Sequence, residues 1–335
     1  MSQAYCWGLG GYGRLGNNDT ASKRTPVAVC GDHNFCYVSQ GYFHTLAIDS
    51  TGKAWAWGYN AFGQIGDNTS ENSRKTPVAV CGTHTFCRIS GGADFTLALD
   101  KNGQAWAWGK NDYGQLGDNT LDRRSTPVAV CGTHTFCYIS CSEYYHSVAI
   151  DKNGQAWAWG IGSAGCLGYN STASARTPVA VCGGHTFCKV SVGCYHAVAI
   201  DKNSQAWSWG ACAYGQLGDN STTSKWTPVA VCGGHTFCQV ACGGYHSIGI
   251  NNHSMAWSWG LSDKGQLGDT STTNKSTPVA VCGGHTFCRI FGGFQYTHAI
   301  DYHRYGWAWG CNDNGQLGDN TVTSRTTPVR ICDPS

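Results

Sequence analysis

The sequence predicts an all-β fold, a seven-bladed β-propeller built from four-stranded repeats of about 50 residues. Three observations predict this fold: Thr-Pro-Val recurs every 50 or 51 residues, Trp-Gly recurs at the same period, and no stretch shows a 3.6-residue apolar period. The prolines of the tripeptide are Pro26, Pro77, Pro127, Pro178, Pro228, Pro278 and Pro328. The tryptophans of the dipeptide are Trp7, Trp57, Trp108, Trp159, Trp209, Trp259 and Trp309.

Residues 177–210, TPVAVCGGHTFCKVSVGCYHAVAIDKNSQAWSWG, contain the four strands expected in one repeat. TPVAV carries its proline at the start of a strand, where the missing N–H is tolerated. FCKVS and the alternating HAVAID are the second and third strands, and the tetrad at 201–204 that leads into QAWSWG is typical of a hairpin turn. QAWSWG is the fourth strand, and a long loop leads from it to the next repeat.

The repeats predict one propeller domain over residues 1–335. Residues 4–8 are a fourth strand with no preceding three, and residues 327–332 are a first strand with nothing after it. We expect these two segments to meet as an abbreviated seventh blade that closes the ring. The other six blades are expected at about 26–58, 77–109, 127–160, 178–210, 228–260 and 278–310.

Tryptophan dominates the fourth strand of each repeat. In the stretch AWAW at 54–57 both indoles point to one side of the strand and both alanines to the other, because side chains alternate. Of the fourteen tryptophans, only Trp226 lies outside these strands. We therefore expect the indoles to pack between blades rather than to hold a cofactor or sense light.

The composition excludes several classes of protein. The formal net charge is +2 and 13% of the residues are charged, so no basic stripe indicates nucleic-acid binding. The apolar runs are only a few residues long, so no membrane insertion is expected. The chain opens on MSQAYCWG, where no secretion signal is visible. Either a signal has been removed or export uses another route.

The sequence resembles the regulator-of-chromosome-condensation repeat family. The resemblance rests on GYFHTLAID followed by AWAWG at 41–58 and FGQIGDN at 62–68, with copies in every period. The histidine of Gly-x-x-His is kept at most copies but is replaced by Phe95 and Tyr296, and the Gly-Gln-Leu-Gly loop is altered at 13–16 and 165–168. The ultraviolet-sensing plant members carry a tryptophan in this turn, whereas this chain has Tyr-Phe or Tyr-Tyr, which argues against that role.

Six Cys-x5-Cys pairs recur with the repeat. Each pair brackets the expected first hairpin turn, which would place two sulfurs on facing strands and favours disulfides. Metal binding is the alternative because each loop reads Cys-x2-His-x2-Cys, but a closed zinc site needs four ligands; reduced thiols are a third possibility. Disulfides would indicate an oxidising compartment and an extracellular, cell-surface or virion location. The pairs are Cys30/Cys36, Cys81/Cys87, Cys131/Cys137, Cys182/Cys188, Cys232/Cys238 and Cys282/Cys288, with Cys6/Cys332 as a further expected bridge.

The topology of alternating strands sorts the turns onto two faces. The GGHTF and DKNG turns share one face, where the text hardly varies. The turns before the HxLAID strand and the long loops after Trp-Gly share the other face, where the text changes from blade to blade. Loops on a rigid frame often carry function, so this variable face is the candidate binding face; freely drifting loops are the alternative. The expected contact residues are Tyr59, Phe62, Tyr113, Tyr144, Tyr145, Tyr195, Tyr214, Tyr245 and Phe294.

No catalytic residues, metal site or cofactor are expected. The recurring histidines are interpreted as hydrogen-bonding residues of the fold, and no serine or cysteine stands in a unique nucleophile setting. The tetrad Asp-Lys-Asn-Gly offers one carboxylate, where calcium prefers several oxygens. The sequence therefore indicates a protein that is not an enzyme.

Three functions are compatible with these patterns. The first is a surface or secreted interaction scaffold whose partner is a protein, a glycan or a neighbouring subunit. The second is a structural component of a virion or extracellular assembly. The third is nucleotide exchange on a small GTPase, as in the founding member of the family that the chain resembles. The even repeat period argues against exchange, because it leaves no room for an inserted wedge.

Overall fold

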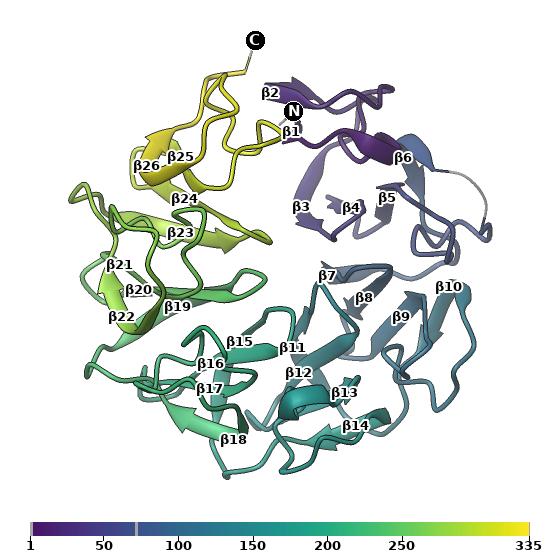
Figure 1. The fold of residues 1–335 in the computed structure, drawn as a ribbon. Coiled ribbons are helices and arrows are strands. Elements are labelled where there is room, and N and C mark those ends of the chain that lie inside the picture. Colours follow the sequence, from purple (N-terminus) through teal and green to yellow (C-terminus); the bar gives the residue numbers. More distant parts are fainter. Residues whose placement is uncertain (1–2, 71–72, 335) are drawn as a thin grey trace.

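The structure, a computed structural model, describes residues 3–70 and 73–334 and confirms the all-β propeller. Six four-stranded antiparallel sheets stand in a ring, and a two-stranded sheet of β1 (Tyr5–Gly8) and β2 (Lys23–Ala28) lies between the last sheet and the first (Figure 1). Two short 3₁₀ turns, Gly11–Gly13 and Ser163–Gly165, lie in the long loops. Among the described residues, no helix is long and apolar enough to cross a membrane.

Each four-stranded sheet runs outward from the ring axis through four strands that are consecutive in the chain. The first strands are β3 (Phe35–Gln40), β7 (Phe86–Gly91), β11 (Phe136–Cys141), β15 (Phe187–Val192), β19 (Phe237–Cys242) and β23 (Phe287–Gly292). The second strands are β4 (His44–Asp49), β8 (Phe95–Asp100), β12 (His146–Asp151), β16 (His196–Asp201), β20 (His246–Asn251) and β24 (Tyr296–Asp301).

The outer half of each sheet holds the tryptophan strand and the Thr-Pro-Val strand. The third strands are β5 (Ala54–Gly58), β9 (Ala105–Gly109), β13 (Ala156–Gly160), β17 (Ala206–Gly210), β21 (Ala256–Gly260) and β25 (Gly306–Gly310). The fourth strands are β6 (Arg74–Ala79), β10 (Arg124–Ala129), β14 (Ala175–Ala180), β18 (Lys225–Ala230), β22 (Lys275–Ala280) and β26 (Arg325–Arg330).

The expected strand order within a blade is wrong. The Thr-Pro-Val strand is the outermost strand of the sheet before it, where it pairs with the tryptophan strand, for example Val78 with Ala56. The stretch CGTHT then crosses from the outer edge of one sheet to the inner strand of the next. An edge position suits the proline, because its missing N–H faces no further strand. The sheets therefore span about 35–79 and its repeats, not 26–58 and its repeats.

The expected pairing of the two terminal segments is also wrong. Residues 327–332 do not pair with residues 4–8; instead β26 pairs with β25, with Val329 opposite Ala308. β1 pairs with β2, with Cys6 opposite Val27. Within the described residues, six of the expected seven blades are four-stranded sheets.

The hydrophobic core is a series of layers between neighbouring sheets. In one such layer Leu46 and Ile48 of β4 pack against Phe86 and Ile89 of β7 and against Trp108. Trp108 is fully buried, as are its counterparts in the other four-stranded sheets. The expectation that the second tryptophan of each strand packs between blades is confirmed.

A polar lock joins neighbouring sheets within these layers. The indole Nε1 of Trp108 donates to the carbonyl oxygen of Gln64, 3.0 Å away in the long loop of the preceding sheet. Thr96 Oγ1 donates to the same oxygen at 2.9 Å, and His44 Nε2 lies 2.9 Å from Thr96 Oγ1. Gly66 follows this loop with φ +78°, and a Cβ there would lie 2.6 Å from Trp108 Nε1, so only glycine admits the indole.

Candidate functional site

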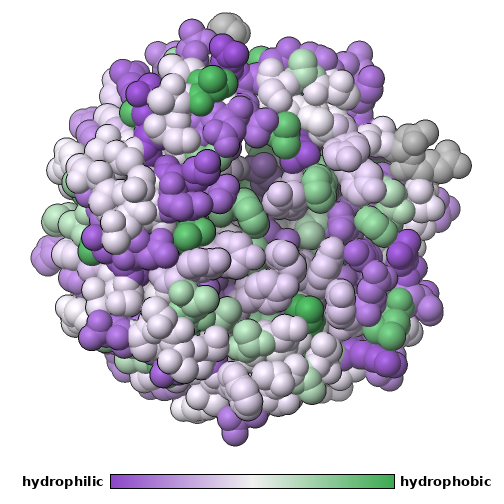
Figure 2. Space-filling view, viewed as in Figure 1, coloured by the Kyte–Doolittle hydropathy of each residue, from purple (hydrophilic) through white to green (hydrophobic). Residues whose placement is uncertain are grey.

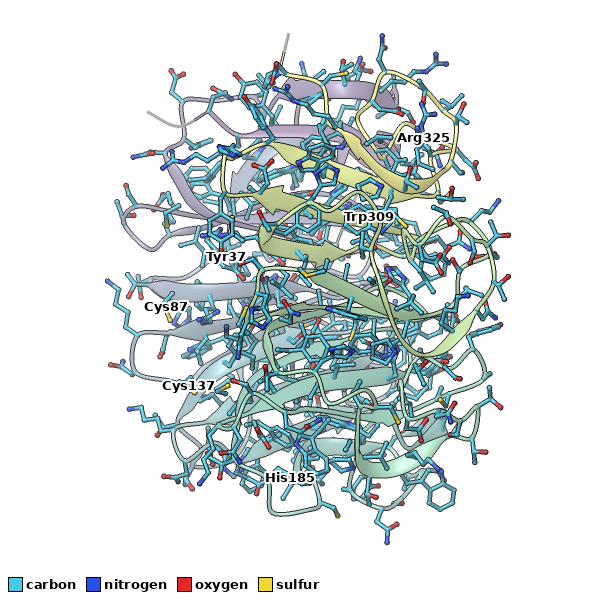
Figure 3. The ribbon with its side chains drawn as sticks, turned by 90° about the vertical axis from the view of Figure 1, so that its left-hand side faces the viewer. Tyr37, Cys87, Cys137, His185, Trp309 and Arg325 are labelled. Carbon is cyan, nitrogen blue, oxygen red and sulfur yellow. The ribbon has the colours of Figure 1, made fainter. Side chains whose placement is uncertain are left out.

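The predicted division of turns between two faces is confirmed by backbone hydrogen bonds. On one face, which we call the loop face, Tyr59 N in a long loop donates to Phe43 O at 3.0 Å. On the opposite face, which we call the crossover face, Phe86 N donates to Gly52 O at 2.8 Å, which joins a crossover to a hairpin turn. In the side view, Cys87 and Cys137 lie near the crossover face and Arg325 lies at the other side (Figure 3).

The candidate contact residues lie on the loop face and touch one another in two aromatic chains. Tyr144 links the two chains, because it stacks on Tyr195 at 4.5 Å between ring centroids and is hydrogen-bonded to Tyr245. Tyr113 and Tyr214 are 40% and 38% exposed, whereas the other seven are partly buried. The contacts are Tyr59–Phe62, Tyr113–Tyr145, Tyr144–Tyr145, Tyr144–Tyr195, Tyr214–Tyr245 and Tyr245–Phe294.

A lysine lies between two of the aromatic residues of the loop face. Lys110 Nζ lies 4.9 Å from the ring centroid of Phe62 and 4.5 Å from that of Tyr145. It also donates to Tyr145 Oη at 3.1 Å and lies 3.6 Å from a carboxylate oxygen of Asp112. Arg123 covers the Phe62 ring from a second direction, at 4.6 Å from its centroid. Cations over aromatic faces hold these rings in a defined orientation.

Asp94 is the buried carboxylate of this cluster. Its exposed fraction is 6%, and Tyr145 Oη donates to Oδ2 at 3.5 Å. Oδ1 is buried without a hydrogen-bond partner. Burial raises the pKa of Asp94, and the nearby Lys110 opposes that shift. A buried acceptor without a partner is costly, so Asp94 is equipped to accept a donor from a bound molecule.

The sequence interpretation missed Asp94, Lys110, Arg123 and Glu143, because it considered only aromatic residues. A usable signal exists: each interrupts a repeated text, as in GAD for GYF and SEYY for GCY. Glu143 lies near the ring axis, where its Oε2 is buried without a partner and burial raises its pKa to about 7.

The crossover-face histidines have a structural role in the described residues. The ring of His185 lies 3.8 Å from that of Trp207, and the other five crossovers repeat this contact at 3.8 to 3.9 Å. No group of three or more His, Cys, Asp or Glu side chains that could hold a metal occurs in residues 3–70 and 73–334.

The prediction of disulfides is wrong: all twenty cysteines lie in the described part of the chain, and all are free. The physical reason is the strand order, since the two cysteines of a pair lie on different sheets. Cys81 follows the outer strand β6, whereas Cys87 lies on the inner strand β7 of the next sheet. The same separation applies to every predicted pair, namely Cys30/Cys36, Cys81/Cys87, Cys131/Cys137, Cys182/Cys188, Cys232/Cys238 and Cys282/Cys288.

The second cysteine of each pair is exposed on the first strand of a sheet and contacts the backbone of the second strand instead of another sulfur. The thiol of Cys36 donates to Ile48 O at 3.4 Å, and that of Cys188 donates to Ile200 O at 3.4 Å. The remaining four thiols make the same kind of contact from Cys87, Cys137, Cys238 and Cys288.

The predicted terminal bridge is absent as well. Cys6 and Cys332 are both free, because β1 and β26 pair with other strands rather than with each other. Burial raises the pKa of the Cys6 thiol to about 12. The inference of an oxidising compartment therefore loses its basis.

The regulator of chromosome condensation (RCC1) repeat matches residues 2–48, 51–99, 102–150, 153–200, 203–250, 254–300 and 307–335. Human E3 ubiquitin-protein ligase HERC2 is 29% identical over 57% of this chain, and the matched part is 4% of HERC2. The ultraviolet-B receptor UVR8 of Arabidopsis thaliana is 26% identical over 52% of this chain, and the match covers 40% of UVR8. The chain thus spans less than half the length of these curated relatives.

Solved structures share the fold over nearly the whole chain. Human WBSCR16 superposes with a TM-score of 0.90 at 19% identity, covering 99% of this chain and 94% of WBSCR16. Prp20p from Saccharomyces cerevisiae, whose structure was described together with its binding to Gsp1p and histones, superposes with a TM-score of 0.86 at 21% identity. That superposition covers 98% of this chain and 85% of Prp20p.

These comparisons correct two sequence-based interpretations. An extracellular, cell-surface or virion location is contradicted, because it depended on disulfides that do not form and the similar proteins include Prp20p. A scaffold or structural role in an extracellular assembly or virion is contradicted too, and nucleotide exchange is the better fit. The predicted exclusion of nucleic acid has no support from the similar proteins.

Proposed function

Because the chain belongs to the regulator of chromosome condensation (RCC1) repeat family, we propose that it binds a small GTPase and promotes release of its guanine nucleotide. The observation that carries the proposal is the match of nearly the whole ring to Prp20p, a protein described as binding Gsp1p. The partner proposed here is therefore a folded protein rather than a glycan.

We further propose that the loop face is the contact surface. Tyrosine and arginine are enriched at protein interfaces and often anchor them, and this face gathers Tyr113, Tyr145 and Arg123 around Lys110. The unpartnered oxygen of Asp94 suits a lysine or arginine of the GTPase. Lys110 and Arg123 suit its carboxylates. Mixed charges beside aromatic rings favour one orientation of the partner over others.

The exchange activity follows from binding thermodynamics. A protein that lowers the affinity of a GTPase for nucleotide must itself bind the nucleotide-free GTPase more tightly than the loaded one, by the same factor. The loop face needs no catalytic group for this, only contacts that favour one conformation of the GTPase. This agrees with the expectation of no catalytic residues.

A rigid ring would support such a surface, and we propose that the ring is one domain with seven positions. β1 and β2 would occupy the seventh position. Trp7 Nε1 donates to Gln316 O at 3.1 Å, which repeats the contact that Trp108 makes with Gln64. Asn320 N donates to the carbonyl of Arg24 at 3.1 Å. Both contacts support closure of the ring through the two-stranded sheet.

Release of a fluorescent GDP from Gsp1p tests the function. The full chain should accelerate release in proportion to its concentration, and it should form a stable complex with Gsp1p stripped of nucleotide by EDTA. Excess GDP should dissociate that complex. A chain that neither accelerates release nor binds stripped Gsp1p would contradict the proposal.

A further inference from the structure

The inner edge of β1 has no neighbouring strand among the described residues. In each four-stranded sheet the tryptophan strand pairs with the Thr-Pro-Val strand on one side and with the second strand on the other, as when Trp57 lies opposite Thr45. β1 is the corresponding tryptophan strand, yet in the described part of the chain it pairs with β2 alone. A free strand edge can accept another strand.

The sheet on one side of this opening leaves its apolar side chains uncovered. Val38 of β3 is 50% exposed, whereas Ile89 at the same position of β7 is 1% exposed. Ile89 is covered by Leu46 and Ile48 of the sheet before it. No second strand precedes β3 among the described residues, so Val38 lacks that cover.

The sheet on the other side is uncovered in the complementary way. Phe291 of β23 is 48% exposed. His298 of β24 is partly exposed, whereas Leu97 at the same position of β8 is fully buried. His298 Nε2 lies 2.9 Å from Gln316 O, the carbonyl that elsewhere accepts a threonine or serine hydroxyl from the next second strand. His298 thus stands in for a strand that the described residues do not supply.

A cavity lies between the two uncovered sheets. Its volume is about 220 Å³, and Trp7, Gly8, Gln40 and Tyr296 are among the residues that line it. Figure 2 shows the loop face, which is hollowed near the centre of the ring. The opening therefore has a free backbone edge, two apolar walls and an internal space.

We propose that this opening binds a β-hairpin of a separate polypeptide, which completes the two-stranded sheet to four strands. The strand next to β1 would run antiparallel to it and place a leucine, isoleucine or valine against Val38. The inner strand would place a phenylalanine and a second aliphatic side chain against His298 and Phe291. This chemistry is read from the filled interfaces of the same ring, such as Leu46 and Ile48 against Phe86 and Ile89. Strand addition to a free edge is a common mode of peptide recognition.

This inference is independent of the proposed exchange function. It concerns the ring interior between β24 and β3, whereas the proposed GTPase contacts centre on Lys110 and Tyr145. An active exchange factor could lack a hairpin partner, and the reverse also holds.

A synthetic hairpin tests the proposal directly. The probe is a peptide with the sequence of residues 86–100, FCRISGGADFTLALD, carrying the change Cys87→Ser. Isothermal titration should show saturable binding of one peptide per chain, and amide hydrogen exchange at Tyr5–Gly8 should slow. A control peptide with Phe86→Asp and Leu97→Asp should not bind, because it would bring charges into an apolar opening.

Two matched variants of the protein locate the binding. Val38→Asp should weaken binding at least roughly tenfold, because the carboxylate would be buried against the hairpin. Met255→Asp changes a residue that is 42% exposed on the crossover face and should leave the affinity unchanged. Equal binding to Val38→Asp, or unchanged exchange in β1, would overturn the proposal.

A fusion guards against a peptide that fails to fold alone. A copy of residues 83–100 joined after Ser335 by a flexible linker should raise the melting temperature and protect β1 from hydrogen exchange. If neither the peptide nor the fused copy protects β1, the opening does not accept a hairpin. If the unfused chain is a dimer in which β1 is already protected, a second copy fills the opening and the proposal is wrong.

Discussion

His44 of one sheet and Thr96 of the next are joined by a contact of 2.9 Å between Nε2 and Oγ1 inside the interface of the two sheets. The same contact joins His196 to Ser247 and His246 to Thr297, also at 2.9 Å. Both residues of each pair are buried, so the contact satisfies two polar groups that water cannot reach.

His146 breaks this pattern, and the break predicts a stabilising substitution. Neither ring nitrogen of His146 has a hydrogen-bond partner, because Ala197 stands where the other sheets carry threonine or serine. Ala197→Ser should supply that hydroxyl and raise the free energy of unfolding by about 1 kcal/mol. Urea denaturation measures the change. Ala149→Ser, at another fully buried alanine, is the control and should destabilise.

The buried histidines predict a loss of stability in mild acid. Burial lowers the pKa of His44, His146 and His196 to about 3 and that of His246 to about 4. In the unfolded chain a histidine pKa is about 6.5, so below that pH the unfolded state binds protons that the folded state does not. The free energy of unfolding should therefore fall as pH falls from about 6.5 towards 4, by up to about 1.4 kcal/mol per pH unit for each histidine.

Urea midpoints at several pH values between 7.5 and 4.5 measure this slope. His146→Phe should reduce it by about one proton, and Phe95 shows that phenylalanine fits this position, since it is fully buried there. A profile without a slope between pH 7 and 5 would contradict burial of these histidines in the neutral form.

The crossover histidines should affect stability without any metal. His185→Ala removes a ring that lies 3.8 Å from Trp207 and should lower the free energy of unfolding by about 1 kcal/mol. His303→Ala, at an exposed histidine, should have little effect. Adding zinc or EDTA should leave the melting temperature of the wild-type chain unchanged. A zinc-dependent shift that His185→Ala abolishes would restore the Cys-x2-His-x2-Cys metal hypothesis.

The cysteines should all react as thiols. Alkylation of the denatured chain without reductant, followed by intact mass measurement, should count twenty modified cysteines. The melting temperature should be the same with and without dithiothreitol. A mass short of the full count in steps of two alkyl groups would indicate disulfides.

The repeat text predicted the propeller and the two faces, because strand alternation decides which turns lie together. It did not predict where a blade begins. In a cyclic repeat, Thr-Pro-Val can equally be the first strand of one blade or the last of the blade before, and periodicity is the same in both cases. The position of Pro77 at an outer edge was the only local signal, since proline suits edge strands.

The disulfide prediction failed for the same reason. Cys81 and Cys87 would face each other only if the strands around them formed a hairpin, and the shift of one strand places them on different sheets. The aromatic residues of the loop face were predicted because their text varies. Asp94 and Lys110 were not, because the contact that unites them with Tyr145 depends on the spacing of neighbouring sheets.

The most direct test of the proposed function is nucleotide release from Gsp1p with variants of the two faces. Tyr113→Ala with Tyr145→Ala should reduce the acceleration at least roughly thirtyfold, because buried tyrosines anchor interfaces by about 1–2 kcal/mol each. His134→Ala with His185→Ala, on the crossover face, should leave the acceleration per folded molecule unchanged. The result that would contradict the account is full acceleration by the tyrosine variant together with loss of acceleration in the folded histidine variant.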